Sequence, residues 1–247
     1  MYITICAILY FFQDSLIFFP QPTLVDLDRP NIQSLTIPTD SVVLEGYIER
    51  SAGTGSIIYF PGNAEEVSPF IGSTAYSGNL IAFNYRGYGK SAGKPSEEAL
   101  FHDSLVIYDT LVNSGLIDPK HTIIMGRSLG TGVASYLASK RVSSGLILIT
   151  PFDSLESVAK EKYAIFPISI LLRHKFLSST YLKNYHGPSL IISGGQDRVI
   201  PNSHTDYLIQ SLSWKVQTLR IPLADHNSIM DFSEVDMAIR GFLVENF

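Results

Sequence analysis

Short apolar runs that alternate with helical segments are the feature that most constrains the fold of this 247-residue chain. Each run has the length of a buried strand, and the segments between most of them carry apolar residues at helical spacing. The runs are Ser56–Phe60, Leu80–Tyr85, Thr122–Met125, Gly145–Thr150, Leu190–Ser193 and Val216–Ile221, and the helical segments are Glu97–Asn113, Leu129–Lys140, His204–Leu212 and Glu234–Glu245. This alternation predicts an α/β fold with a mostly parallel sheet covered by helices on both faces.

Two further strands are predicted ahead of these runs. The stretches "QSLTIPTD" and "SVVLEGYIER" read as an antiparallel pair joined by a tight polar turn. No linker or internal repeat follows, so we expect a single domain over residues 20–247. With 45% hydrophobic and 17% charged residues the chain can build a large core, and its net charge of −5 without a basic run argues against a nucleic-acid partner.

Residues 1–19 form an apolar N-terminal segment that is interrupted by Asp14. The segment lacks the basic start and the small-residue cleavage site of a secretory signal, and it is shorter than a comfortable bilayer crossing. We predict that it is a membrane-associating anchor, which favours a membrane-associated over a soluble cytoplasmic protein. The alternatives are an apolar helix packed on the domain and the remainder of a longer signal-anchor.

Ser128 lies in "GRSLGTG", between a predicted strand and a predicted helix. At such a sharp turn Gly126 and Gly130 lack the side chains that would collide with the strand or the helix. The hydroxyl is then pushed into a cleft, where the N–H groups at the start of the helix favour negative charge. The pattern predicts an activated nucleophile, although G-x-S-x-G alone also occurs in ordinary turns.

Ligands of parallel sheets bind beyond the carboxyl ends of the strands, so the residues that follow each apolar run are the candidates for a site. "PGNAEEV" follows Phe60, and its Gly-Asn pair leaves backbone N–H groups pointing into the cleft. We predict that the amide of Asn63 and the amide of Leu129 hold an oxyanion, with Ala64 as the neighbour that could replace Asn63.

Asp197 in "GGQDRVIP" and His226 in "PLADHNSI" each follow a late predicted strand. Asp197 could hold His226 in the tautomer that acts as a base, and the chain order Ser128, Asp197, His226 is that of α/β-hydrolases. Two carboxylates compete for the role of acid: Asp225, and Asp153, which also reads as a helix N-cap. We rank Asp197 first because its Gly-Gly exit indicates a tight loop.

The histidines and the single cysteine argue against a metal site and an intrachain disulfide. None of the six histidines pairs with another histidine, cysteine or glutamate at metal-ligand spacing, which disfavours a metal hydrolase. Cys6 is the single cysteine, so an intrachain disulfide is excluded. Acyl transfer through a serine needs no cofactor, and we expect none.

Seven stretches of the chain match a known family: "FFPQP", "PGNA", "NYRGYGKSAGKPSE", "GRSLGTGVA", "TPFDSL", "GGQDRVIP" and "DHN". From about Phe18 to the end, the sequence resembles the α/β-hydrolase superfamily. Within it, the sequence is similar to the Bem46-like serine hydrolases and to membrane-associated hydrolases that remove palmitate from proteins. The resemblance implies an eight-stranded sheet with Ser128 as nucleophile, Asp197 as acid and His226 as base.

Two departures from that family stand out. Pro61 occupies the position where relatives usually carry histidine, and since the donor there is a backbone amide, we expect the oxyanion hole to be kept. The cysteine-rich N-terminus of the mammalian depalmitoylating enzymes is absent from this sequence, which weakens the transfer of that specific activity.

The stretch between the sixth and seventh strands, residues 154–187, predicts a minimal cap rich in Ile, Leu, Phe and Tyr. Such a cap favours an open apolar acyl pocket, unless these residues simply pack on the sheet. We therefore predict a serine hydrolase of carboxylic esters or thioesters, acting on an acyl-lipid or acyl-protein substrate. The alternatives are a serine peptidase or amidase with the same three residues, and a hydrolase-like domain that binds without turnover.

Overall fold

The computed structural model describes residues 1–73 and 76–247, and in these residues eight strands form one sheet. The strands are β1 (Ile32–Pro38), β2 (Val43–Arg50), β3 (Ser56–Phe60), β4 (Asn79–Phe83), β5 (Thr122–Arg127), β6 (Gly145–Ile149), β7 (Ser189–Gly194) and β8 (Gln217–Ile221). Their order is β1-β2-β4-β3-β5-β6-β7-β8. Strand β2 is antiparallel to both of its neighbours, and all other pairs are parallel. The predicted fold class and the antiparallel N-terminal pair are confirmed.

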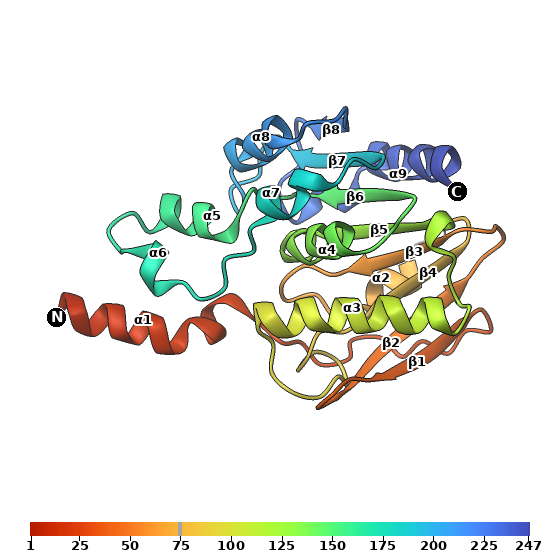
Figure 1. The fold of residues 1–247 in the computed structure, drawn as a ribbon, viewed down its shortest axis with the longest axis horizontal. Coiled ribbons are helices and arrows are strands. Elements are labelled where there is room, and N and C mark those ends of the chain that lie inside the picture. Colours follow the sequence, from red (N-terminus) through yellow and green to blue (C-terminus); the bar gives the residue numbers. More distant parts are fainter. Residues whose placement is uncertain (74–75) are drawn as a thin grey trace.

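The helices described are α1 (Tyr2–Ile17), α2 (Ser68–Ser73), α3 (Glu97–Asn113), α4 (Leu129–Lys140), α5 (Leu155–Lys162), α6 (Ile168–Leu171), α7 (Ser178–Tyr181), α8 (Asn202–Ser211) and α9 (Ser233–Asn246), with 3₁₀ turns at η1 (Pro119–His121), η2 (Leu182–Asn184) and η3 (Ser228–Asp231). The predicted bounds of α3 and α4 are confirmed, and those of α8 and α9 differ from the prediction by at most two residues. Helices α5, α6 and α7 belong to the segment between β6 and β7, so the predicted cap consists of short helices and loops (Figure 1).

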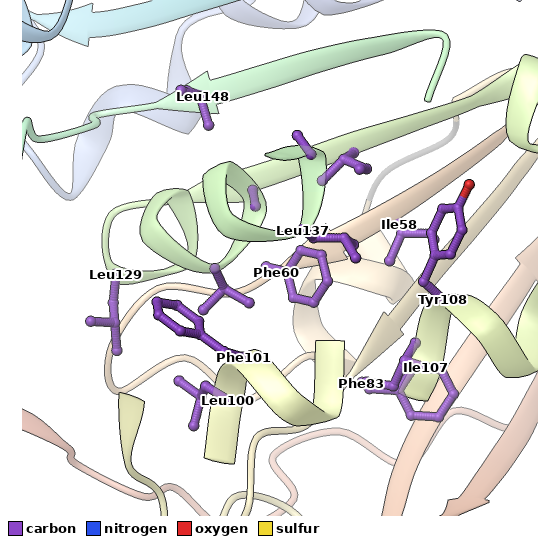
Figure 2. Close-up of a cluster of buried hydrophobic side chains, with 14 of the residues drawn as sticks. Ile58, Phe60, Phe83, Leu100, Phe101, Ile107, Tyr108, Leu129, Leu137 and Leu148 are labelled. Carbon is purple, nitrogen blue, oxygen red and sulfur yellow. The ribbon is translucent and has the colours of Figure 1, made fainter. Parts of the chain in front are cut away.

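Each face of the sheet is buried under its own set of helices. Along β3, Ile58 and Phe60 belong to the core beneath α3, α4 and α8, whereas Ile57 and Tyr59 belong to the core beneath α2 and α9. Figure 2 shows the first core, in which Phe60 lies beside Leu137 of α4, with Leu100 and Phe101 of α3 and Leu129 of α4 in the same cluster. Burial on both faces explains why the central strands are continuous apolar runs in the sequence.

Helix α1 lies outside these layers, beside α6 (Figure 1). The side chain of Gln13 is buried there: Nε2 donates to Leu171 O at 3.0 Å, and Oε1 accepts from Arg173 N at 2.7 Å. At the other end of α1, the ring of Tyr2 stacks on Phe166. The N-terminal segment is thus an apolar helix packed along the cap. In the described part of the chain, no helix combines the length and the hydropathy needed to span a bilayer.

Candidate active site

Ser128 lies at the turn between β5 and α4 with a backbone φ of 48° and ψ of −117°. A positive φ is unfavourable for a serine, so the surrounding structure must hold it in place. The Ser128 N–H donates to Ile149 O at 2.9 Å, and the Ser128 carbonyl accepts from Thr131 N at 2.9 Å and from Thr131 Oγ1 at 2.6 Å. These bonds fix a sharp turn at the carboxyl edge of the sheet.

The two glycines around the serine sit where no side chain fits. A Cβ on Gly126 would lie 2.4 Å from Gly130 O, and a Cβ on Gly130 would lie 2.1 Å from Phe60 O. Both contacts are far shorter than van der Waals distance and involve backbone atoms. The prediction that these positions need glycine is therefore confirmed.

Ser128, His226 and Asp197 are joined by hydrogen bonds in the order that the sequence predicts. His226 Nε2 lies 2.8 Å from Ser128 Oγ, and His226 Nδ1 lies 2.7 Å from Asp197 Oδ2. The second oxygen, Asp197 Oδ1, accepts from Val199 N and Ile200 N at 2.8 Å each. An ionised carboxylate only accepts, so Nδ1 is assigned the proton and the lone pair of Nε2 faces the serine hydroxyl.

The first competing carboxylate, Asp153, is bonded to a different histidine. Asp153 Oδ1 lies 2.7 Å from His204 Nδ1, and both side chains are buried. The prediction that Asp153 caps the following helix is wrong. Ser154 is the N-cap of α5, and its Oγ accepts from Ser157 N at 3.0 Å. Asp153 thus links the end of β6 to α8.

The side chain of Asp225, the second competing carboxylate, forms its hydrogen bonds within its own loop. Asp225 Oδ1 accepts from Asn227 N, Ser228 N and Ser228 Oγ at 2.9 Å each. These bonds, those from Ser228 above all, lower the pKa of Asp225 below its ordinary value. Asp197 is therefore the carboxylate that is hydrogen-bonded to His226. Among the described residues, no group of three or more His, Cys, Asp and Glu side chains could hold a metal ion.

The loop of residues 61–65 after β3, called the oxyanion loop after the role predicted for it, runs beside the serine, and not all of its backbone amides have an acceptor in the protein. Gly62 N–H donates to Glu65 Oε2 at 2.7 Å, and Ala64 N–H donates to Asn63 Oδ1 at 2.9 Å. In the described part of the chain the N–H of Asn63 donates to no protein acceptor, and Leu129, as the first residue of α4, has no intrahelical acceptor. Of the two amides that the sequence offered for this role, the amide of Asn63 rather than that of Ala64 is thus the one without a protein acceptor.

Two buried tyrosines and one glutamate hold the oxyanion loop in place through hydrogen bonds. Tyr85 Oη donates to Pro61 O at 2.9 Å, and Tyr59 Oη donates to Glu65 Oε1 at 2.6 Å. Burial raises the pKa of both phenols well above the ordinary tyrosine value, and the charge of Glu65 raises it further. Both hydroxyls therefore stay protonated and act as donors. The sequence signals had singled out neither tyrosine nor Glu65.

The side chain of Asn63 connects the oxyanion loop to the end of α1. Its Oδ1 accepts from Tyr88 Oη at 2.9 Å and from Phe19 N at 3.1 Å, while its Nδ2 donates to Ile17 O at 2.5 Å. Burial raises the pKa of Tyr88 to about 12, so this hydroxyl also remains a donor. Because Asn63 lies more than forty residues from Phe19 along the chain, sequence reasoning could not find this contact.

Comparisons with known proteins find both uncharacterized relatives and relatives that are named as alpha/beta hydrolases. No protein-family model matches it. An uncharacterized protein of Mycobacterium tuberculosis is 32% identical over 169 residues, which cover 68% of this chain and 60% of the relative, so the match spans less than two thirds of the relative's length. A protein of Acanthamoeba polyphaga mimivirus whose name assigns it to the alpha/beta hydrolases is 30% identical over 201 residues, 78% of this chain and 72% of the relative.

Two further comparisons extend over almost the whole chain. An uncharacterized membrane protein of Saccharomyces cerevisiae is 28% identical over 259 residues, covering 97% of this chain and 91% of the relative. Among solved structures, an esterase of Pyrococcus furiosus superposes with a TM-score of 0.73 at 18% identity, covering 92% of this chain and 99% of the esterase. At this identity the structural likeness concerns the fold.

Proposed function

This chain belongs to the α/β-hydrolase family, and from that premise we propose that it is a hydrolase that cleaves carboxylic ester or thioester bonds through an acyl-enzyme on Ser128. The observation that carries the proposal is the continuous run of hydrogen bonds from Asp197 through His226 to Ser128. A serine hydroxyl is a weak nucleophile until a neighbouring base removes its proton, and this arrangement supplies that base.

The proposed reaction proceeds in two steps. Ser128 Oγ attacks the carbonyl carbon while His226 Nε2 takes the hydroxyl proton, and the ring stays oriented by Asp197. The N–H groups of Asn63 and Leu129 hold the oxyanion that develops on the carbonyl oxygen. When the tetrahedral intermediate collapses, His226 protonates the departing alcohol or thiol. A water molecule then attacks the acyl-enzyme by the same proton route and releases the carboxylic acid.

We propose an acyl lipid or an acylated protein at a membrane surface as the substrate class. Five exposed apolar side chains support this: Ile3, Phe11 and Phe12 of α1 with Ile165 and Ile170 of the cap, each between 62% and 82% exposed. They are called the apolar face below. Large apolar side chains left exposed on a helix and on the segment it packs against are typical of a part of the chain that lies in a membrane interface. The name of the yeast relative, a membrane protein, agrees with this proposal.

The test of the catalytic proposal is the intact mass of the protein after exposure to a fluorophosphonate. We expect one adduct on the wild type and none on Ser128→Ala. Ser139→Ala is the matched control, because Ser139 lies on the same helix and its hydroxyl bonds only to Tyr136 O. No adduct on folded wild-type protein would overturn the proposal and favour a hydrolase-like domain that binds without turnover.

A substrate comparison separates the proposed activity from a peptidase or amidase. Acyl thioesters, acyl esters and peptide amides with the same acyl group are offered to the wild type, with Ser128→Ala as the blank. We expect turnover of the esters and thioesters, increasing with acyl-chain length. Faster turnover of the amide would replace the esterase proposal with the amidase alternative.

A further inference from the structure

We propose that Arg127 and Glu65 form a positioning pair that fixes the oxyanion loop relative to the histidine loop, residues 222–227, across the nucleophile. The inference rests on the proposed serine-hydrolase function and adds two residues to its site. Neither residue would touch the reacting atoms. Their role would be to hold the two loops that do, which lie at opposite sides of Ser128 in the sheet order.

Both carboxylate oxygens of Glu65 accept hydrogen bonds, one from strand β3 and one from within the oxyanion loop. Oε1 accepts from Tyr59 Oη at 2.6 Å, and Oε2 accepts from Gly62 N at 2.7 Å. Gly62 passes directly beside the nucleophile, because a Cβ added to it would lie 3.5 Å from Ser128 Cβ. Glu65 therefore fixes the backbone immediately before the free N–H of Asn63.

Arg127 extends this contact to the histidine loop. It is the last residue of β5 and directly precedes Ser128. Its Nη1 lies 3.6 Å from Glu65 Oε2, while its Nη2 donates to Asn227 O at 3.2 Å and to His226 O at 3.4 Å. One planar guanidinium thus contacts both loops at once, which the single ammonium of a lysine could not do as well.

Both side chains are largely shielded from water, with 20% of Arg127 and 17% of Glu65 exposed. Shielding strengthens their attraction relative to a surface ion pair. The oxyanion donor and the base sit on separate loops, and catalysis requires both to keep their places relative to Ser128 Oγ within a fraction of an ångström. A rigid link between the loops is therefore expected to act on the chemical step rather than on binding.

The test compares Arg127→Gln, Glu65→Gln, the double variant and Arg127→Lys with the wild type. Arg141→Gln is the matched control, since Arg141 pairs with Asp109 at 2.7 Å on α3 and contacts neither loop. The measured quantities are the maximal rate of fluorophosphonate labelling at Ser128 and the reagent concentration giving half that rate. Melting curves identify the variants that are folded at the assay temperature.

We expect each glutamine variant to label about tenfold more slowly, with the half-saturating concentration unchanged within about twofold. The double variant should label Ser128 at about the rate of the slower single variant, because both substitutions break the same link. Arg127→Lys should fall between the wild type and Arg127→Gln, and Arg141→Gln should match the wild type. If Arg127→Gln does not fold, the labelling rates of Glu65→Gln and Arg127→Lys are compared with that of the wild type instead.

Three results would overturn the inference: unchanged labelling in the folded variants, a change confined to the half-saturating concentration, or fully additive losses in the double variant. The second result would mean that Arg127 contacts the reagent itself. Failure of the proposed function looks different, because the wild type itself would then carry no adduct on Ser128.

Discussion

At the scale of single residues, Gly130 decides how closely α4 approaches the sheet. A Cβ there would lie 2.1 Å from Phe60 O and 2.5 Å from Pro61 O, and neither backbone atom can rotate away. Gly130→Ala must therefore shift the start of α4 and, with it, the serine and the oxyanion loop. We expect a loss of about 1–3 kcal/mol in the free energy of unfolding and about a hundredfold slower labelling of Ser128.

The measurements are urea denaturation and the fluorophosphonate labelling rate. Gly241→Ala is the control: Gly241 also lies inside a helix, α9, but a Cβ there would meet nothing within 4 Å. Alanine at that position should stabilise the protein by up to about 1 kcal/mol through helix propensity. Equal stability and labelling for Gly130→Ala and the wild type would contradict the close approach.

The predicted site residues differ in how much the sequence could say about them. Ser128, Asp197 and His226 each follow a strand, and the edge of a parallel sheet brings such positions together. Local pattern ranked Asp197 above Asp153 by its Gly-Gly exit, but it could not show that Asp153 is bonded to His204 of α8, about fifty residues further along. Arg127 could not be predicted in the same way, because its contacts are to Glu65, His226 and Asn227, all of which lie more than sixty residues away along the chain.

At the scale of elements, strands and long helices were predictable, whereas the short helices were not. Strands buried on both faces are unbroken apolar runs, and α3 and α4 present several turns of apolar spacing to the sheet. Helices α6 and α7 span four residues each, too few for any period to show. Their positions depend on long-range contacts, such as the bonds that Glu97 of α3 accepts from Lys175 N and Phe176 N.

Helix α1 depends on a comparable long-range contact, and this gives a prediction at the element scale. Asp14 Oδ1 accepts from Arg173 Nη2 at 2.6 Å and from His174 Nε2 at 2.8 Å. Asp14→Asn removes the charge that holds this end of α1. We expect lower amide-exchange protection in α1 and a global stability loss below about 1 kcal/mol, since the aspartate is half exposed.

Acid should act on the same contact. Burial raises the pKa of Asp14, but the hydrogen bond from His174 and the charge of Arg173 outweigh it and leave that pKa below its ordinary value. The stabilisation is therefore complete above the ordinary carboxyl pKa and is lost as pH falls through the lowered value.

Asp236→Asn, which breaks an exposed ion pair with Arg240 on α9, is the control and should leave the protection of α1 unchanged. Equal protection in Asp14→Asn and the wild type would argue against this tether.

At the scale of the whole molecule, the apolar face and the candidate active site share one element. The end of α1 and the segment after it bond to Asn63, while α1 also carries the exposed side chains of Phe11 and Phe12. The chain has a net charge of −5, so we do not expect attraction to anionic lipid to drive the proposed membrane binding. We expect apolar burial to drive it instead, with each phenylalanine contributing about 1.5–3 kcal/mol.

We expect the full chain to bind phosphatidylcholine vesicles in a flotation assay and to stay bound at high salt, because apolar burial is not screened. Replacing Phe11 and Phe12 by serine should weaken binding more than about tenfold. Val142→Ser with Val244→Ser is the control, since both residues are exposed and apolar but lie outside the apolar face. Binding that salt abolishes, or that both double variants lose equally, would mean that the apolar face is not the membrane-binding surface. Labelling of Ser128 by a soluble fluorophosphonate should persist in both double variants, so a loss of vesicle binding with intact labelling separates the membrane proposal from the catalytic one.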